Sequence, residues 1–318
     1  MSVRSDRRRV LFLGCGYATR RHSRILGRVR GVDLYYGSRD VERAHAYRRE
    51  FNGRDSFGSY ERAIQHDVDL VVVATPPSSH LELVLSALRA GKNVVVEKPA
   101  FMRAADADEV RAVATQLGLR VFVAENYAYK AIAEHLRRLI AGGDLGEVRF
   151  VTINATKRQV STGWRADPAL GGGNPLFEGG VHWISFAANL GLEIESAHGY
   201  ATAGAESSLI VLKYANGAVG SIAHSWELAA PFGGLRLSKV QGTHGAVTFE
   251  SNGLALFSSG RRRSIRFPAL RDPTGSRAMW SDFLRALNTG AEPLFTLGMA
   301  QRDLRLVEQA AESMATAR

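Results

Sequence analysis

The stretch VVVEKP, residues 94–99, decides how the first part of this chain folds. Three consecutive valines predict a strand that is buried on both faces. A glutamate, a lysine and a proline follow directly, so the strand delivers two opposite charges to its own end. In an open α/β sheet, ligands bind outside the carboxyl ends of the strands. Glu97 and Lys98 therefore indicate a binding site, provided that the flanking segments form such a sheet.

The first 125 residues alternate strand-like and helix-like patterns. We expect strands at 10–13, 32–36, 69–74, 93–97 and 120–124, and helices at 18–29, 40–51, 59–66, 78–90 and 103–117. Near-continuous apolar strands are typical of a parallel sheet with helices on both sides. The predicted fold class of residues 1–125 is therefore α/β.

After residue 145 the pattern changes to alternating strands joined by glycine-containing turns. The clearest signal is a long hairpin over 207–226, with Asn216-Gly217 at its turn. Further strands are expected at 147–156, 235–241, 246–250, 254–258 and 264–267, and helices at 130–142, 178–190, 278–289 and 296–315. This pattern predicts an α+β domain over residues 126–318, with an open and mostly antiparallel sheet.

Composition narrows the possible functions. No apolar run reaches the roughly 18 residues that span a bilayer, and the basic start leads into only VLFL before a glycine-rich loop. We therefore expect a first strand there, not a signal peptide, and no membrane partner. The single cysteine, Cys15, excludes intrachain disulfides and fits a cytoplasmic location. The net charge of +10 fits a solvated basic surface or an anionic ligand such as a nucleotide. We expect no nucleic-acid partner, because no basic stripe is interleaved with aromatic residues, and we assign no metal site.

Gly14 and Gly16 follow the first strand and open a helix. Gly14 permits a tight turn, and Gly16 lets backbone N–H groups approach a pyrophosphate at the helix N-terminus. Thr19 stands where the usual pattern has a third glycine. We expect a dinucleotide held by Gly14, Gly16, Tyr17, Ala18 and Thr19; a glycine-rich turn without a ligand is the alternative.

The end of the second strand distinguishes NAD from NADP. An acidic residue there would hold both ribose hydroxyls. The sequence offers Ser38 and Arg39, and a hydroxyl and a guanidinium suit a 2′-phosphate. We therefore expect NADP(H) to be preferred and NAD(H) to be possible. Asp40 is the alternative ribose ligand if it occupies the strand tip.

The strand at 69–74 ends in ATPPSSH, residues 74–80. Its two prolines neither continue a strand nor easily begin a helix, so the chain turns over the crevice. We therefore add Thr75, Pro76 and His80 to Glu97 and Lys98 in the expected cofactor site.

An ordered set of motifs resembles the Gfo/Idh/MocA oxidoreductases, which include glucose–fructose oxidoreductase, inositol dehydrogenases and sugar-nucleotide dehydrogenases. The set spans nearly the whole chain and comprises GCGYATRRH at 14–22, ATPPSSH at 74–80, AGKNVVVEKPAF at 90–101, AEN at 124–126, GWRADP at 163–168, GGNPLFEGGVH at 172–182 and a closing helix at 296–315. The resemblance implies an N-terminal Rossmann domain and a C-terminal domain with an open sheet. It also implies that Lys98 meets the substrate hydroxyl, that Glu97 helps to place the nicotinamide, and that the Lys98–Pro99 bond is often cis.

The residues themselves support a chemical role for Lys98. Partial desolvation in a crevice lowers the pKa of a lysine, which can then donate to a developing alkoxide or share its proton. A structural ion pair between Lys98 and Glu97 is the alternative.

Glu178 and His182 stand four residues apart, which places both on one face of the helix expected at 178–190. Histidine titrates near neutral pH, so we expect His182 to be the general acid/base, with Lys98 polarising the same oxygen. A satisfied polar histidine is the alternative. Glu178 stands where the resembled family usually has aspartate. Ser185 stands where that family often has aspartate, so we expect the carboxylate that could orient His182 to be missing.

Four residues are expected to line the substrate: Asn126, Tyr127, Trp164 and Arg165. An aromatic ring suits the apolar face of a sugar, and an arginine suits a phosphate or carboxylate. Loop packing is the alternative for Trp164 and Arg165.

Together these expectations describe an NAD(P)-dependent oxidoreductase that transfers a hydride between nicotinamide and a secondary hydroxyl or ketone. The expected substrate is a sugar, a polyol or a nucleotide sugar. The alternatives are an imine or C=C reductase on the same fold and a non-catalytic dinucleotide sensor or scaffold. An exposed sheet face needs cover, so we also expect a homodimer or homotetramer.

Overall fold

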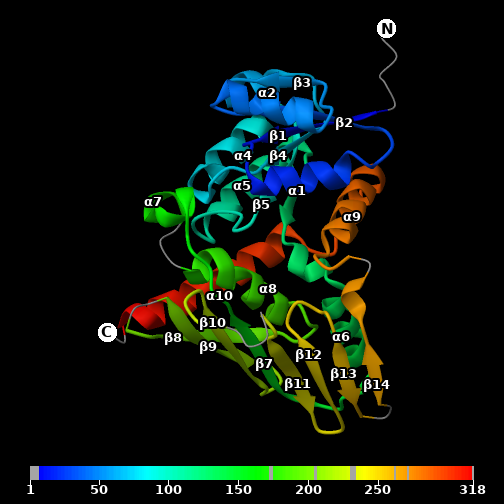
Figure 1. Cartoon of the computed structure of the whole chain (residues 1–318), viewed down its shortest axis with the longest axis vertical. Helices are drawn as coiled ribbons and strands as arrows, with labels where there is room; N and C mark the ends of the chain where they lie inside the picture. Colours follow the sequence, from blue (N-terminus) through cyan, green and yellow to red (C-terminus); the bar gives the residue numbers. More distant parts are fainter. Residues whose placement is uncertain are drawn as a thin grey trace. The chain divides into compact units, whose positions relative to one another are not determined.

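Strand β5 (Asn93–Glu97) carries the VVVE stretch and lies inside a six-stranded sheet of a computed structural model of the chain. The structure describes residues 7–171, 175–203, 206–229, 234–260, 263–270 and 272–316. Two compact units divide the chain. The first comprises Met1–Ala124 and Trp280–Gly298, and the second comprises Glu125–Met279 and Met299–Arg318 (Figure 1).

The first unit contains a parallel sheet with the strand order β3-β2-β1-β4-β5-β6. Its strands are β1 (Arg8–Leu13), β2 (Val32–Gly37), β3 (Asp55–Phe57), β4 (Leu70–Val73), β5 and β6 (Val121–Ala124). The valines of β4 and β5 are completely buried, as their unbroken apolar run predicts. The predicted α/β class is therefore confirmed. Strand β3 was not predicted, because a three-residue edge strand is too short to show a periodic pattern.

Helices connect these strands in the Rossmann manner. They are α1 (Tyr17–Leu26), α2 (Val41–Glu50), α3 (Tyr60–Gln65), α4 (His80–Arg89) and α5 (Asp106–Leu117), with a short 3₁₀ turn η1 (Pro77–Ser79) before α4. The side chain of Asp40 caps α2 by accepting from Arg43 N–H at 3.1 Å, and Ser59 caps α3 in the same way. These caps fix where the helices leave the carboxyl edge of the sheet.

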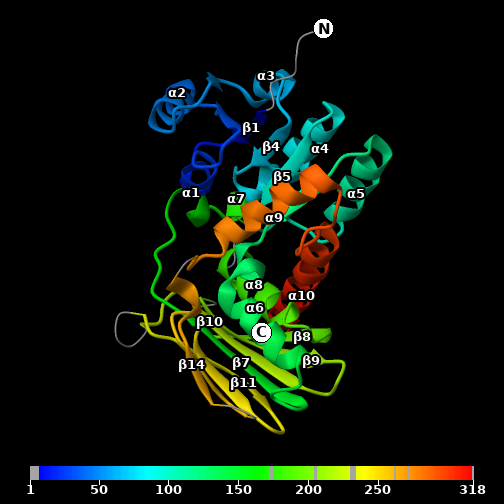
Figure 2. The ribbon, with the colours of Figure 1, turned by 90° about the vertical axis from the view of Figure 1, so that its right-hand side faces the viewer.

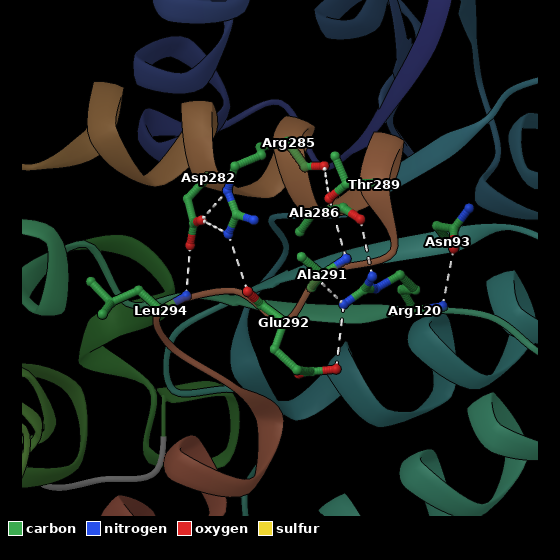
Figure 3. A network of polar contacts seen from close by, with 9 residues as sticks. All are labelled: Asn93, Arg120, Asp282, Arg285, Ala286, Thr289, Ala291, Glu292 and Leu294. Carbon is green, nitrogen blue, oxygen red and sulfur yellow. Dashed lines mark hydrogen bonds and ion pairs between the residues drawn. The ribbon is translucent and has the colours of Figure 1, made fainter.

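A segment from far along the chain completes the first unit. It comprises most of α9 (Ser276–Thr289) and the residues up to Gly298. Arg120, just before β6, donates to the carbonyl oxygens of Ala286 at 3.0 Å and Ala291 at 2.7 Å (Figure 3). Asp282 of α9 accepts from Leu294 N–H at 2.7 Å, which closes the turn that follows the helix (Figure 3). These polar contacts hold α9 and its following loop against the sheet.

The second unit contains an eight-stranded sheet with the order β14-β13-β12-β11-β7-β10-β9-β8. Its strands are β7 (Val148–Thr156), β8 (Ile194–Ala201), β9 (Ser207–Tyr214), β10 (Val219–Ser225), β11 (Leu237–Gly242), β12 (Ala246–Glu250), β13 (Leu256–Ser259) and β14 (Ser264–Arg266). Neighbours pair antiparallel except β7 with β10. The prediction of an open, mostly antiparallel sheet is confirmed. Strand β8 was not predicted, since a register shift between Ile194 and Ser196 interrupts its alternation.

Helices α6 (Ala131–Ala141), α8 (Val181–Ala188) and α10 (Leu297–Thr316) lie on one face of this sheet (Figure 2). The second unit also contains α7 (Pro168–Gly171) and the short turns η2 (Asn126–Tyr129), η3 (Gly163–Ala166), η4 (Leu176–Gly180) and η6 (Pro268–Leu270). The single helix predicted over 178–190 is wrong in detail. A π-helical turn, η4, precedes α8, which ends at Ala188 because Asn189 leaves helical geometry.

Ser185 anchors α8 to α10. Its hydroxyl donates to Asp303, a carboxylate that is only 1% exposed and that also accepts from Asn189 Nδ2 at 2.9 Å. Arg302 donates to the other carboxylate oxygen of Asp303. Ser185 stands where the resembled family often has aspartate, and here its hydroxyl binds a carboxylate of α10.

In the described part of the chain, no helix combines the length and the apolar character needed to cross a membrane. Cys15, the one cysteine of the sequence, is a buried thiol. Burial raises its pKa to about 12, so the group is held as an unreactive thiol.

Candidate active site

The β1–α1 loop has the geometry of a pyrophosphate cradle. Gly14 has φ +93°, and a Cβ there would lie 2.8 Å from the carbonyl oxygen of Ala74. Gly16 precedes α1, and nothing lies within 4 Å of the position a Cβ would take. No side chain caps this helix start, which leaves the first N–H groups for a ligand. Tyr17 is exposed at the first helical position, and Thr19 is buried and donates to Gly14 O at 2.5 Å. Thr19, which stands where the usual pattern has a third glycine, therefore holds the loop in place through this hydrogen bond.

A hydroxyl and a guanidinium follow the end of β2, and a second guanidinium lies in the first turn of α2. Ser38 is buried, and its Oγ accepts from Asp40 N–H at 3.2 Å. Asp40 caps α2, so its carboxylate already serves the backbone. Arg39 and Arg43 are exposed beside it. The strand ends at Gly37, which places Ser38 and Arg39, not Asp40, at its tip.

The loops after β4 and β5 are tied together by His80. This imidazole is fully buried, with Nδ1 at 3.0 Å from Pro99 O and Nε2 at 2.9 Å from Thr75 O. Burial lowers the pKa of His80, which opposes the effect of these carbonyl oxygens. The Lys98–Pro99 bond is cis, in agreement with the resemblance. His80, Thr75 and Pro99 therefore form one structural unit at the carboxyl edge, where Thr75 also binds Ser79 at 2.8 Å.

Glu97 is held by a relay that reaches α9. Trp280 Nε1 donates to His22 Nδ1 at 2.9 Å, and His22 Nε2 lies 2.6 Å from Glu97 Oε1. An indole N–H can only donate, so Nδ1 of His22 accepts and its Nε2–H points to the carboxylate. Burial raises the pKa of Glu97, but the hydrogen bond from His22 and the nearby Lys98 outweigh burial and bring the pKa to about 2. Glu97 is therefore an anion beside Lys98. The backbone N–H of Lys98 donates to Glu97 Oε2 at 3.1 Å.

His182 is oriented by a buried carboxylate of the second unit. Its Nδ1 lies 2.7 Å and 2.9 Å from the two oxygens of Glu125, which is only 2% exposed. Glu125 also accepts from Tyr127 N–H at 2.9 Å, which fixes the carboxylate. The carboxylate sets the tautomer: Nδ1 carries the hydrogen, and Nε2 is the nitrogen that can accept a proton. The expectation that His182 lacks an orienting carboxylate is therefore wrong, because Glu125, the residue that caps η2, supplies the carboxylate that α8 lacks.

Tyr127 covers the face of His182. The two rings are stacked with centroids 4.2 Å apart and an interplanar angle of 11°. The ammonium of Lys130 lies 3.5 Å from the centroid of Tyr127, as a cation–π contact. Trp183 meets Tyr127 edge-on at 5.0 Å. The imidazole therefore sits in an aromatic stack that limits its rotation.

The other predicted residues of the second unit, Glu178, Arg165, Trp164 and Asn126, make contacts of their own. Glu178 pairs with Arg165 through Arg165 Nε and Glu178 Oε1, and the guanidinium of Arg165 lies 4.5 Å from the ring of Trp164. Asn126 donates to Thr274 O at 2.5 Å and is 9% exposed. Arg165 and Glu178 thus neutralise each other, which the sequence did not predict. Gly172 to Asn174 of the GGNPLFEGGVH motif lie outside the described residues.

Three residues of this site were not predicted: Glu125, His22 and Trp280. Glu125 follows β6 inside the AEN motif and His22 ends the GCGYATRRH motif, so their motifs were the available signal. Trp280 carried none, because its partner His22 stands 258 residues away. Within the described ranges, no three His, Cys, Asp or Glu side chains are grouped so that they could hold a metal ion.

Comparison with known proteins identifies the domains. Residues 8–125 match the model described as an oxidoreductase family with an NAD-binding Rossmann fold, and residues 133–248 match the GFO/IDH/MocA C-terminal domain. Trans-1,2-dihydrobenzene-1,2-diol dehydrogenase from Sus scrofa is 31% identical over 205 residues, 62% of this chain and 61% of that protein. D-glucoside 3-dehydrogenase from Escherichia coli (strain K12) is 33% identical over 121 residues, 37% of this chain and 34% of that protein.

Solved structures share the fold over nearly the whole chain. The crystal structure of aldose-aldose oxidoreductase from Caulobacter crescentus, complexed with glycerol, has a TM-score of 0.87 at 24% identity and covers 98% of both chains. The matched stretches of the curated relatives are shorter, at 30%, 45% and 61% of the lengths of the first three. Both domain models nevertheless match in order along this sequence. The chain belongs to the Gfo/Idh/MocA oxidoreductase family.

Proposed function

We propose that this protein is an NAD(P)-dependent oxidoreductase that interconverts a secondary hydroxyl and a ketone on a sugar, polyol or nucleotide sugar. The observation that carries the proposal is the His182–Glu125 pair, in which a buried carboxylate sets the tautomer of an imidazole stacked on Tyr127. Such a pair has the form of a general acid/base with its orienting group. The names of the relatives, a dihydrodiol dehydrogenase and a glucoside dehydrogenase, support an alcohol substrate.

The cofactor is proposed to bind at the carboxyl edge of the parallel sheet. The uncapped start of α1 at Gly16 fits a pyrophosphate, and a bound nicotinamide dinucleotide supplies the hydride chemistry. Tyr17, Ala18 and Thr19 would contribute the N–H groups of that helix start. Thr75, Pro76 and His80 would form the neighbouring loop, and Glu97 would hold the nicotinamide end.

NADP(H) is proposed to be preferred over NAD(H). Arg39 is exposed at the end of β2, Arg43 is exposed in the first turn of α2, and Asp40 serves as a helix cap. A guanidinium can bind a 2′-phosphate through charge-assisted hydrogen bonds, whereas NAD specificity is favoured by a carboxylate at the strand tip. Fluorescence titration of the wild type should give tighter binding of NADPH than of NADH. Arg39→Ala should reduce the preference by about 10-fold or more, and an unchanged ratio in that variant would refute the assignment.

His182 and Lys98 are proposed to act on the reacting oxygen. In the direction of oxidation, Nε2 of His182 accepts the hydroxyl proton while its Nδ1–H stays bound to Glu125. The ammonium of Lys98 donates a hydrogen bond to the same oxygen and stabilises its developing charge. Glu97 keeps that ammonium in place as a neighbouring anion. Trp164 would face the sugar ring, and Glu178 with Arg165 would bind hydroxyl groups of the substrate. Tyr127 is already in contact with His182 and Lys130, so its role would be to hold the imidazole in place.

The molecule is proposed to work as a homodimer or homotetramer. The sheet face opposite to α8 and α10 exposes apolar side chains on successive strands, including Leu209, Val219 and Phe150. Such a face is typical of a contact between copies of one chain.

The direct test compares two single variants on a panel of sugars, polyols and nucleotide sugars with NADP⁺ and NAD⁺. Lys98→Ala and His182→Ala should each lower turnover by about 100-fold or more while NADPH binding persists. Wild-type activity in both variants would exclude the proposed roles. Full activity on imines or activated alkenes, together with none on alcohols, would favour the reductase alternative.

A further inference from the structure

A cluster of polar side chains on the inner face of the second sheet has no part in the chemistry proposed above. His224 of β10 pairs in register with Ala155 of β7, so a small residue lies next to the imidazole. Arg236 lies on the other side, where its Nη1 contacts Thr156 O at 3.5 Å. Trp226 and Lys157 follow directly along the two strands, with Lys157 Nζ 5.6 Å from the indole ring. We call His224, Trp226, Arg236 and Lys157 the inner-face cluster.

Three nitrogen atoms of the inner-face cluster are buried without a partner among the described residues. They are Nε2 of His224, Nε1 of Trp226 and Nε of Arg236. The three side chains belong to residues that are 2%, 4% and 8% exposed. Buried polar atoms are nearly always hydrogen-bonded, and leaving one unpaired costs free energy. Three such atoms, in β10 and in the residues next to the ends of β10 and β11, the two strands that flank β7, therefore point to a missing ligand.

Two of the three unpaired atoms lie close to the segment that carries Glu178. A Cβ built on Gly179 would lie 2.9 Å from Trp226 Nε1 and 3.0 Å from His224 Nε2. Both nitrogens are thus directed at the backbone of Gly179, and any side chain at this position would cover them. Gly179 lies in the π-helical turn η4, a type of distortion that is frequent at functional sites. The inner-face cluster therefore adjoins the segment between Glu178 and His182.

The chemistry of these atoms selects an acceptor with negative charge. Arg Nε and Trp Nε1 can only donate, so the missing group must offer oxygen lone pairs. Arg236 has no carboxylate partner in the described ranges of the chain, and Lys157 adds a second cation. Burial and then Lys157 lower the pKa of His224 to about 4, so its imidazole is neutral near pH 7 and its Nε2 can also donate. Glu178, the carboxylate adjacent in sequence, is already paired with Arg165.

We propose that the inner-face cluster binds an anionic substituent, a carboxylate or a phosphate, of the substrate. The inference deepens the proposed function, on which it rests: it makes the substrate an acidic or phosphorylated sugar derivative. Arg236 and Trp226 donate to the oxygen atoms of that group, and Lys157 supplies charge at longer range. These residues act in recognition and take no part in the proton transfer assigned to His182.

Fluorine NMR of the full chain labelled with fluorotryptophan tests the proposal without turnover. The four tryptophans give four resonances, and Trp226→Phe identifies the one that belongs to Trp226. The NADP⁺-saturated protein is titrated in turn with inorganic phosphate, D-glucuronate and D-glucose. We expect the Trp226 resonance to shift saturably with phosphate or glucuronate and to stay in place with glucose. Arg236→Leu should lower the affinity for the anion that binds by about 10-fold or more, since the substitution removes a desolvated hydrogen-bond donor and a positive charge.

A matched variant separates recognition from folding. Tyr214→Phe removes a buried polar atom from the neighbouring strand β9, where the hydroxyl has a partner in Ala187 O. It should leave the anion affinity unchanged. The proposal is overturned if neither anion moves the Trp226 resonance, if glucose moves it equally, or if Arg236→Leu binds the anion like the wild type. Because binding is read directly, failure of the oxidoreductase assay would leave this result interpretable.

Discussion

At the scale of the residue, the tautomers of two histidines are set by neighbours that can either only accept or only donate a hydrogen bond. Glu125 can only accept in its ionised form, so Nδ1 of His182 must donate. Trp280 can only donate, so Nδ1 of His22 must accept. The two imidazoles therefore present opposite tautomers, each set by its fixed neighbour. This arrangement gives His182 a basic Nε2 and gives Glu97 a hydrogen-bond donor.

Glu125→Gln should lower kcat by about 100-fold, because an amide can donate to Nδ1 and so favour the wrong tautomer. The variant keeps the size and the packing of the side chain, so NADPH affinity and the thermal midpoint should change little. Steady-state kinetics on the best alcohol substrate measures the effect.

The control is Glu134→Gln, which removes an exposed carboxylate paired with Arg138 on α6. Its kcat should equal that of the wild type. If Glu125→Gln retains full turnover, His182 does not depend on this carboxylate for its protonation state.

At the scale of the element, Arg120 joins α9 to the parallel sheet. Its guanidinium donates to two carbonyl oxygens and reaches Glu292 Oε1 at 3.5 Å. Arg120→Leu removes these charge-assisted hydrogen bonds and leaves the carbonyls unpaired. We expect the free energy of unfolding to fall by about 2 kcal/mol, measured by urea titration.

Arg89→Leu is the comparison for Arg120. Its ion pair with Glu109 spans 3.8 Å between two largely exposed side chains. Exposed pairs contribute about 0.5 kcal/mol or less, so this variant should unfold nearly like the wild type. Equal losses in the two variants would show that Arg120 does not hold α9 in place.

Asp303 makes the joint between α8 and α10 sensitive to pH. Burial raises its pKa to about 6, against the effects of Arg302, Ser185 and Asn189. The folded state therefore holds this proton more tightly than the unfolded state. The protonated Asp303 therefore contributes to the free energy of unfolding fully below about pH 4. This contribution, about 3 kcal/mol in all, is lost as the pH rises through about 6. Relative to Asp303→Asn, which cannot titrate, the wild type should lose unfolding free energy across this interval.

Urea unfolding at several pH values between about 4 and 7 measures that difference. Glu312→Gln removes an exposed carboxylate of the same helix, so its free energy of unfolding should change with pH as that of the wild type does. A constant gap between wild type and Asp303→Asn would contradict the raised pKa.

The sequence predicts the elements better than the contacts between them. The valine runs of β4 and β5 and the Asn216-Gly217 turn are local signals, and the structure confirms the elements that they indicate. The Glu125–His182 contact joins residues 57 positions apart, and the Trp280–His22 contact joins residues 258 apart. Spacing within one helix cannot reveal such partners. For this reason the prediction placed Glu178 and His182 on one helix face without naming their partners, whereas the structure pairs Glu178 with Arg165 and His182 with Glu125.

At the scale of the whole molecule, the second sheet has one covered and one bare face. Side chains that point toward α8 and α10, such as Ile153 and Ile222, are buried. Their neighbours in the strands point the other way, and six apolar side chains of that outer face are 42–55% exposed: Phe150, Tyr200, Leu209, Val219, Leu237 and Phe257. They belong to six different strands, so the apolar surface extends across most of the sheet. Exposed apolar side chains that gather on one face are typical of a surface that is buried in an assembly.

Phe150→Asp should dissociate the proposed assembly, because β7 is a central strand of the sheet and a carboxylate buried in a contact between copies would lose its hydration without gaining a partner. Light scattering at micromolar concentration should give a multiple of the monomer mass for the wild type and the monomer mass for the variant. Leu117→Asp, at a comparably exposed apolar position on α5 of the first unit, should keep the wild-type mass. A monomeric wild type would refute the assembly, and an intact Phe150→Asp oligomer would place its contact elsewhere. Because His182 and Glu125 belong to one unit of one chain, their hydrogen bond needs no second copy, and a folded Phe150→Asp monomer should retain it.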